Sequence, residues 1–178
     1  MKSKAECRVI ARQVWREFLS DEARMSAMLG NLKTEAAGIS GLVLAYAAMP
    51  GEFDVLQALQ FPLYLPRTGA NRQMEFLKTQ SIASLLPGRF GILEPGPENP
   101  ALPRELGPED FVIVPTLAVN KERFRLGKGG GYYDRQRSML QGAVKAAVIP
   151  FELTRMQFES LEYDMQIDLV ITERGVLK

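Results

Sequence analysis

The densest group of chemically useful residues in this 178-residue chain is the stretch FRLGKGGGYYDR, residues 124–135. Its glycines let the backbone approach a ligand closely, and free amides at the start of a helix favour an anion such as phosphate. Arg125 and Lys128 add positive charge at the same place. The stretch follows the apolar segment 111–119, and a loop between a buried strand and a helix is where open α/β sheets bind ligands.

The glycine spacing departs from the two common nucleotide motifs. GKGGG has neither the GxxxxGK[ST] pattern of a Walker A loop nor the GxGxxG dinucleotide fingerprint. Three consecutive glycines alone are equally typical of a flexible surface turn, with the tyrosines as core packing. Tyr132, Tyr133 and Asp134 favour a binding loop, because aromatic rings can wall a planar ligand and an aspartate can hold a hard cation. The combination indicates a nucleotide-dependent enzyme.

The chain contains no histidine and a single cysteine, Cys7. The missing histidine removes hydrolase triads and histidine-bound metals from consideration. One cysteine excludes an intramolecular disulfide and a cysteine zinc cage, which fits a reducing compartment. Catalysis would therefore rely on carboxylates, Lys, Arg, Tyr, backbone amides and an oxygen-liganded metal such as Mg²⁺.

The overall composition predicts one soluble domain covering residues 1–178, with 46% hydrophobic residues and a net charge of +1. This charge balance gives no reason to expect a nucleic acid or an anionic membrane as partner. The longest apolar run, 42–49, is far too short to span a membrane, and no apolar segment follows the N-terminal lysines. We expect a cytoplasmic monomer whose partners are small molecules.

Apolar periodicity predicts the elements that must position these residues. Helices are expected over 3–19, 20–37, 52–60, 133–140 and 154–161, and strands over 42–49, 61–66, 73–79, 111–119, 143–150 and 167–172. Residues 87–108 hold six prolines and four glycines, which predicts a long loop in which the segment FGILEP is packed down. Apolar strands alternating with helices indicate an α/β fold with a mainly parallel sheet flanked by helices.

The segment RLGKGGGYYDR resembles the signature RLGxGxGYYDx of the 5-formyltetrahydrofolate cyclo-ligases, also called methenyltetrahydrofolate synthetases. Similarity continues in Lys4-x-x-x-Arg8, PGEFDVLQAL, MEF, GILEP, EDFVIVPTLAV and EYDMQIDLVITE. The resemblance implies a single Rossmann-like domain. It also implies an enzyme that uses ATP and Mg²⁺ to close 5-formyltetrahydrofolate into 5,10-methenyltetrahydrofolate, releasing ADP and phosphate through a phosphorylated formyl intermediate. Such chemistry needs mainly alignment and charge neutralisation at the phosphoryl group, so no histidine is required.

The resemblance implies an ATP site formed by the first helix and the glycine loop. Lys4 and Arg8 share one helix face, although their spacing alone is more typical of a solvated basic surface. The implied ATP-binding residues are Lys4, Arg8, Arg125, Gly127, Lys128, Gly129, Gly130, Gly131, Tyr132 and Tyr133. The implied catalytic residues are Arg125, Lys128 and Tyr132, with Arg125 or Lys128 stabilising the transferring phosphoryl group.

The resemblance also implies a folate site and a metal site. Glu52 matches a glutamate that binds the pterin ring, where a carboxylate accepts from two neighbouring N–H donors; alternatively it is a charge favoured at a helix start. The implied substrate-binding residues are Ala47, Glu52, Met74, Phe76, Lys128, Gly129, Gly130, Gly131 and Tyr132. Asp134 and Asp164 resemble magnesium-binding carboxylates, and their alternative role is a helix cap or a salt bridge.

Three positions depart from the family pattern. Val55, Asn120 and Tyr163 stand where the family usually has threonine, aspartate and histidine. These departures leave open a paralogue that binds ATP and a folate-like ligand with a different substrate or without turnover. An RNA-associated accessory protein is a further alternative, against which the near-neutral charge counts.

Overall fold

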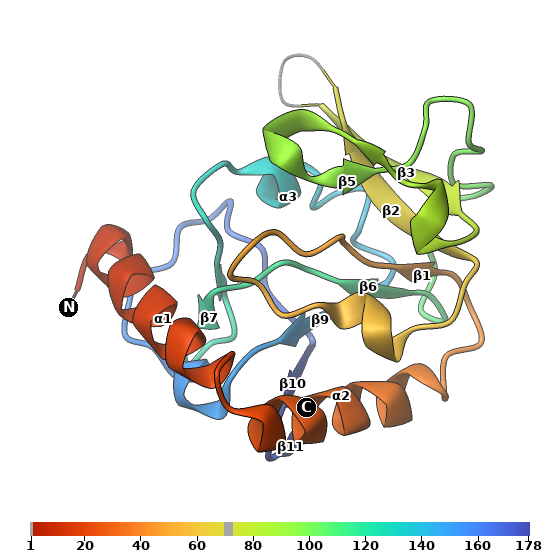
Figure 1. Ribbon diagram of the computed structural model, residues 1–178. Coiled ribbons are helices and arrows are strands. Elements are labelled where there is room, and N and C mark those ends of the chain that lie inside the picture. The colour runs from red at the N-terminus through yellow and green to blue at the C-terminus, as the bar shows by residue number, and fades with distance from the viewer. Residues whose placement is uncertain (1, 70–72) are drawn as a thin grey trace.

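A seven-stranded sheet forms the centre of the protein in a computed structural model that describes residues 2–69 and 73–178 (Figure 1). Its strands are β1 (Val43–Leu44), β2 (Leu63–Thr68), β3 (Met74–Thr79), β6 (Phe111–Ile113), β9 (Val144–Val148), β10 (Leu169–Thr172) and β11 (Gly175–Leu177). They lie in the order β11-β10-β9-β6-β1-β2-β3, and neighbours from β10 to β2 run parallel. The pairs at the two edges are antiparallel. The predicted α/β fold with a mainly parallel sheet is confirmed.

The strand order reverses beside β1. From β1 the chain passes to β2 on one side, and later strands run from β6 through β9 to β10 on the other. In open α/β sheets such a reversal leaves a crevice outside the carboxyl ends of the strands, where ligands bind. The topology therefore marks the ends of β1 and β6 as the place for a ligand site.

The first helix, α1 (Lys4–Phe18), begins with a capping box. The Ser3 hydroxyl accepts from the Glu6 amide at 3.2 Å, and the Glu6 carboxylate accepts from the Ser3 amide at 2.8 Å. The buried side chains Cys7, Ala11, Trp15 and Phe18 recur at helical spacing. The Trp15 indole N–H donates to the Leu117 carbonyl at 3.0 Å, so α1 is fixed to the segment that follows β6.

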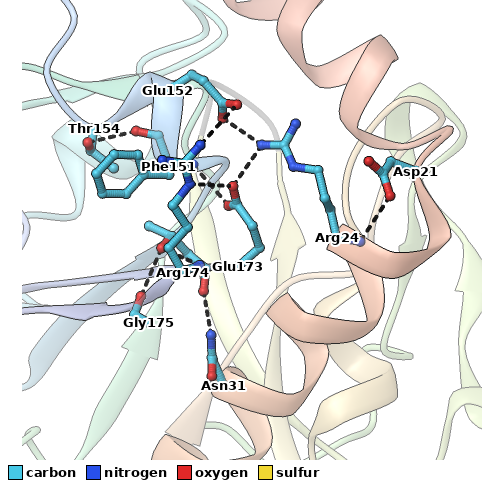
Figure 2. Close-up of polar contacts among 10 residues, drawn as sticks. Asp21, Arg24, Asn31, Phe151, Glu152, Thr154, Glu173, Arg174 and Gly175 are labelled. Atoms are coloured by element: carbon cyan, nitrogen blue, oxygen red, sulfur yellow. Dashed lines mark hydrogen bonds and ion pairs between the residues drawn. The ribbon is translucent and has the colours of Figure 1, made fainter.

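The second helix, α2 (Glu22–Ala36), packs against β10 and β11 and is tied to them by a polar network (Figure 2). The Arg24 guanidinium lies 2.6 Å from the Glu152 carboxylate and 2.7 Å from the Glu173 carboxylate. Glu173, with 6% of its side chain exposed, also accepts from the Phe151 amide at 3.0 Å. One buried carboxylate thus joins the helix, the turn after β10 and the segment after β9.

The helix expected over 154–161 is wrong. A short 3-10 helix, η5 (Phe151–Leu153), precedes this segment, and the segment itself is irregular. The Met156 amide donates to the Val119 carbonyl at 2.9 Å, and Phe158 is buried. The backbone amides and apolar side chains that would have stabilised a local helix therefore form contacts with distant parts of the chain instead.

Two other expected helices are shorter than predicted. Over 52–60 the structure has a 3-10 helix, η1 (Val55–Ala58), which begins where the Asp54 carboxylate accepts from the Leu56 amide at 3.1 Å. Over 133–140 it has α3 (Tyr132–Arg135) followed by turns. The helix ends at Arg135, and the next residue, Gln136, caps it. The side-chain amide of Gln136 donates to the Met74 carbonyl on β3 at 3.0 Å.

The structure contains several short strands that the sequence did not predict. Pro115 divides the expected strand 111–119 into β6 and β7 (Ala118–Val119), and β7 pairs with β8 (Arg125–Leu126). Within the proline-rich region, β5 (Leu93–Glu94) pairs with β4 (Leu86–Pro87). Part of the segment is packed down, since Glu94 is buried and Ile92 packs against the core, whereas Leu93 is exposed. The other expected strands are present with shifted or shorter bounds. In the described parts of the chain, no helix is long and apolar enough to cross a membrane.

Replacing Glu173 with Gln is expected to lower the free energy of unfolding by about 1–2 kcal/mol, because it removes a buried negative charge that faces Arg24. Urea unfolding at pH 7 measures this change. Glu75→Gln is the matched control, since Glu75 is 57% exposed on β3 and lies 3.9 Å from Arg67; its effect should stay below about 0.5 kcal/mol. Equal losses for the two variants would contradict the importance of the network.

Candidate functional site

A cavity of about 520 Å³ lies at the carboxyl ends of the central strands. Tyr46 and Ala47, which follow β1, line it together with Pro115, which follows β6, and Thr68, which ends β2. The glycine loop between β8 and α3 forms another part of its lining. The cavity therefore occupies the place that the reversal of strand order marks for a ligand.

The structure brings together nearly all the residues that the sequence indicated. The predicted residues that line the cavity are Lys4, Arg8, Ala47, Glu52, Met74, Arg125, Gly127, Lys128, Gly129, Gly130, Gly131, Tyr132, Tyr133, Asp134 and Asp164. Phe76 does not line it. Its ring packs edge-on against Tyr133, with centroids 6.3 Å apart, and is 2% exposed, so Phe76 supports the wall from behind.

Arg125 is the structural centre of the glycine loop. Its amide donates to the Met165 carbonyl at 3.0 Å, and its guanidinium donates to the Pro115 carbonyl at 2.9 Å and to the Asp134 carboxylate at 2.8 Å. The guanidinium also lies 5.6 Å from the centre of the Tyr133 ring. Arg125 is 6% exposed, so a buried charge joins the end of β6, the start of α3 and the segment before β10.

The glycines give the loop a shape that other residues would disturb. Gly129 and Gly131 have φ angles of +104° and +67°, a region that residues with a Cβ adopt at a cost. A Cβ on Gly127 would lie 2.7 Å from Nη1 of Arg125. The Gly127 carbonyl accepts from Nε of Arg8 at 2.8 Å, so α1 is joined directly to the loop.

Three cations in the cavity each face a carboxylate. Lys4 lies 2.5 Å from Asp164, Lys128 lies 2.7 Å from Glu52, and Arg125 lies 2.8 Å from Asp134. The first pair joins α1 to the segment before β10, the second joins the glycine loop to the segment after β1, and the third joins β8 to α3. An anionic ligand that uses any of these cations must therefore compete with a carboxylate of the protein.

Asp134 and Asp164, the two carboxylates expected to hold magnesium, both line the cavity. Asp134 uses Oδ1 for Arg125 and for the Met165 amide, and Asp164 uses Oδ2 for Lys4 and for the Leu161 amide. The other oxygen of each carboxylate has no protein partner among the described residues. No group of three or more metal-binding side chains occurs in residues 2–69 and 73–178. Two carboxylates leave most ligand positions to phosphate and water, as Mg²⁺ prefers.

Two buried tyrosines border the cavity as neutral hydrogen-bonding groups. Burial, together with the nearby Glu52 charge, raises the pKa of Tyr46 well above its ordinary value. Burial likewise raises the pKa of Tyr133, against the opposing effect of Arg125. The Tyr133 hydroxyl is buried without a partner in the described chain. Both phenols therefore keep their protons at neutral pH.

Several lining residues were missed from the sequence. They are Tyr46, Met49, Pro66, Thr68, Ile92, Glu94, Pro115, Leu126 and Leu161, and Tyr163 was noted only as a departure from the family pattern. Ile92 and Glu94 belong to the segment that was expected to pack down within the proline-rich region, and this was the available signal for them. Tyr46 and Thr68 lie in or beside ordinary apolar strand patterns, where nothing distinguishes a lining residue from a core residue.

Comparison with known proteins matches the chain to one family. The model of the 5-formyltetrahydrofolate cyclo-ligase family matches residues 43–173. A 5-formyltetrahydrofolate cyclo-ligase of Mycolicibacterium smegmatis is 43% identical over 67 residues, which are 37% of this chain and 32% of that protein. One of Mycoplasma genitalium is 29% identical over 119 residues, 64% of this chain and 70% of that protein. The chain thus aligns with only about a third of the first relative.

Solved structures share the fold. A 5,10-methenyltetrahydrofolate synthetase of Aquifex aeolicus superposes with a TM-score of 0.72 at 26% identity, covering 97% of this chain and 91% of that one. A 5,10-methenyltetrahydrofolate synthetase of Mycoplasma pneumoniae has a TM-score of 0.71 at 17% identity, covering 97% and 99%. The resemblance that the glycine motif indicated is confirmed, and Lys4 and Arg8 lie outside the range matched by the family model.

Gly127→Ala is expected to lower the free energy of unfolding by about 1–3 kcal/mol, because its Cβ would press on the buried Arg125 guanidinium. Gly30→Ala is the control. Gly30 lies inside α2 with no atom within 4 Å of a built Cβ, so alanine there should stabilise by about 0.5–1 kcal/mol. Urea unfolding of both variants measures the difference, and two stabilising substitutions would show that the loop accommodates a methyl group.

Proposed function

The chain belongs to the 5-formyltetrahydrofolate cyclo-ligase family, and from this we propose that it uses ATP to close 5-formyltetrahydrofolate into 5,10-methenyltetrahydrofolate, with release of ADP and phosphate. One observation carries the proposal. A single cavity contains the glycine loop with its basic residues and also Glu52 and Met74, the expected folate contacts. A phosphate donor and a folate can therefore meet in one space.

The basic side of the cavity is proposed to bind ATP. Lys4 and Arg8 extend from α1, and Arg125 and Lys128 from the loop. The main-chain amides from Gly127 to Tyr133 complete this side. Positive charge and fixed amides stabilise a transferring phosphoryl group because charge accumulates on its oxygens in the transition state. Arg125 is held by the protein in advance and needs little reorganisation.

The opposite side is proposed to bind the folate. Glu52 is fixed by the Met49 amide, which donates to Oε2 at 2.8 Å, while Oε1 faces Lys128. A carboxylate fixed in this way can accept from the adjacent N–H donors of a pterin ring. Met74 and Ala47 supply apolar surface, and Tyr132, at the start of α3, lines the cavity as well.

Asp134 and Asp164 would hold the magnesium ion through their free oxygens. When bound, Mg²⁺ neutralises charge on the phosphate oxygens. The protein's own part is to align the formyl oxygen with the γ-phosphate and to limit the access of water. Phosphorylation turns that oxygen into a good leaving group, so the neighbouring arylamine can attack the formyl carbon and phosphate can depart.

The absorbance of methenyltetrahydrofolate should grow when the protein is mixed with ATP, Mg²⁺ and 5-formyltetrahydrofolate. The increase in absorbance should require ATP, Mg²⁺ and 5-formyltetrahydrofolate, and one ADP should form for each methenyltetrahydrofolate. Absence of product at high enzyme concentration would refute the proposed reaction. ATP consumption in the presence of the folate without this product would instead support a paralogue with another substrate.

The Lys128–Glu52 pair is proposed to link the two halves of the site. The Lys128 ammonium bridges from the glycine loop to the carboxylate expected to meet the pterin, and it also lies 3.5 Å from the Met49 sulfur. ATP would draw Lys128 away from Glu52, and the folate would displace Lys128 from the same carboxylate. Whichever ligand binds first breaks the pair, so the second ligand binds more tightly.

A non-hydrolysable ATP analogue is therefore expected to bind about fivefold more tightly when 5-formyltetrahydrofolate is present. The folate would already have broken the ion pair, so the analogue is spared that cost, which is about 1 kcal/mol for a half-exposed pair. In Lys128→Met this enhancement should disappear. Lys145→Met is the control, because Lys145 forms an ion pair of the same length, 2.7 Å, with Asp168 at the other end of the sheet. Calorimetric titration measures the ratio, and an unchanged ratio in Lys128→Met would refute the link.

A further inference from the structure

Glu94 is a fourth carboxylate of the cavity and differs from the other three. It lies on β5, inside the proline-rich region, and is 6% exposed. Glu52, Asp134 and Asp164 each face a cation within 2.8 Å. Across residues 2–69 and 73–178, Glu94 forms no ion pair. Among these residues, the Glu94 carboxylate is therefore both buried and without a counter-cation.

The protein holds the Glu94 carboxylate in a defined orientation. Oε1 accepts from the Thr68 hydroxyl at 2.6 Å and from the Thr68 amide at 3.2 Å. A Cβ on Gly88 would lie 2.4 Å from the Glu94 carboxyl carbon and 2.5 Å from Oε2, so the missing side chain makes room for the group. The second oxygen has no hydrogen bond from the described part of the chain.

Such an arrangement indicates a ligand with an N–H donor. Burying a carboxylate without a cation is costly, and two hydrogen bonds to one oxygen compensate only part of that cost. The nearby lining is apolar, with Pro66, Met74 and Ile92. Thr68 stands opposite Met74 in the β2–β3 register, and Gln136 joins Met74 to the end of α3. Glu94 thus belongs to the wall assigned to the folate, on a different element from Glu52.

We propose that Glu94 accepts a hydrogen bond from the arylamine N–H of the substrate and receives its proton as the ring closes. This role rests on the proposed function. The arylamine lone pair forms the new C–N bond to the formyl carbon, and phosphate leaves with the electrons of the C–O bond. The proton of the arylamine passes to Oε2 of Glu94. Holding that hydrogen also directs the lone pair of the nitrogen toward the carbon.

Glu94→Gln tests this role because the amide oxygen can still accept from Thr68, whereas an NH₂ group replaces Oε2, the proposed proton acceptor. Formation of methenyltetrahydrofolate should fall at least about 100-fold in kcat. The thermal midpoint should be no lower than that of the wild type, because a buried charge is removed. The affinity for a non-hydrolysable ATP analogue should match the wild type. Glu75→Gln, which changes an exposed glutamate on the neighbouring β3, should keep full activity.

Isotope exchange separates ring closure from phosphoryl transfer. ATP labelled with ¹⁸O at the β,γ-bridge scrambles its label when phosphoryl transfer to the formyl oxygen is reversible. Glu94→Gln should retain folate-dependent scrambling while product formation fails. Wild-type product formation in Glu94→Gln, or a parallel loss of scrambling and product, would overturn the assignment. A wild-type protein without product or scrambling would instead refute the proposed function itself.

Discussion

The site depends on burying one positive charge, the guanidinium of Arg125, at the point where three segments meet. The end of β6 supplies the Pro115 carbonyl, α3 supplies the Asp134 carboxylate, and the Met165 carbonyl before β10 accepts from the Arg125 amide. None of these segments has long regular structure that would position it alone: α3 has four residues and β8 has two. A charged group with several fixed partners supplies the rigidity that a longer helix would otherwise provide.

Charge compensation explains why so many ionisable residues can surround one cavity. Lys4, Arg125 and Lys128 each have a carboxylate partner, so the ligand-free protein avoids an accumulation of positive charge. A ligand then has to replace a partner within the protein rather than bind an unpaired charge, which lowers the net gain in affinity. It also favours ligands whose groups can bind both members of an ion pair. Arg8 and Glu94 differ from these residues, since neither forms an ion pair within residues 2–69 and 73–178.

The predictable part of the site is contiguous in sequence or follows from a recognised motif. Arg125 to Asp134 occupy one stretch, and the reversal of strand order brings Glu52 to the same crevice. The contact between Thr68 and Glu94 could not be predicted, because it depends on β5 folding back over the end of β2, and a two-residue strand leaves no periodic pattern. The false helix over 154–161 has a related cause: local periodicity contains no information about the Val119 carbonyl, which accepts from the Met156 amide.

The close fit between Gly88 and Glu94 has an evolutionary consequence. A side chain at position 88 would occupy the space of the carboxylate at position 94. A lineage that keeps the acid at 94 is therefore restricted to glycine at 88, while loss of the acid would free position 88 to vary. Substitutions at the two positions should therefore be coupled, and their order should matter. A substitution at 94 first makes room for a side chain at 88, whereas a substitution at 88 first gives a poorly packed intermediate.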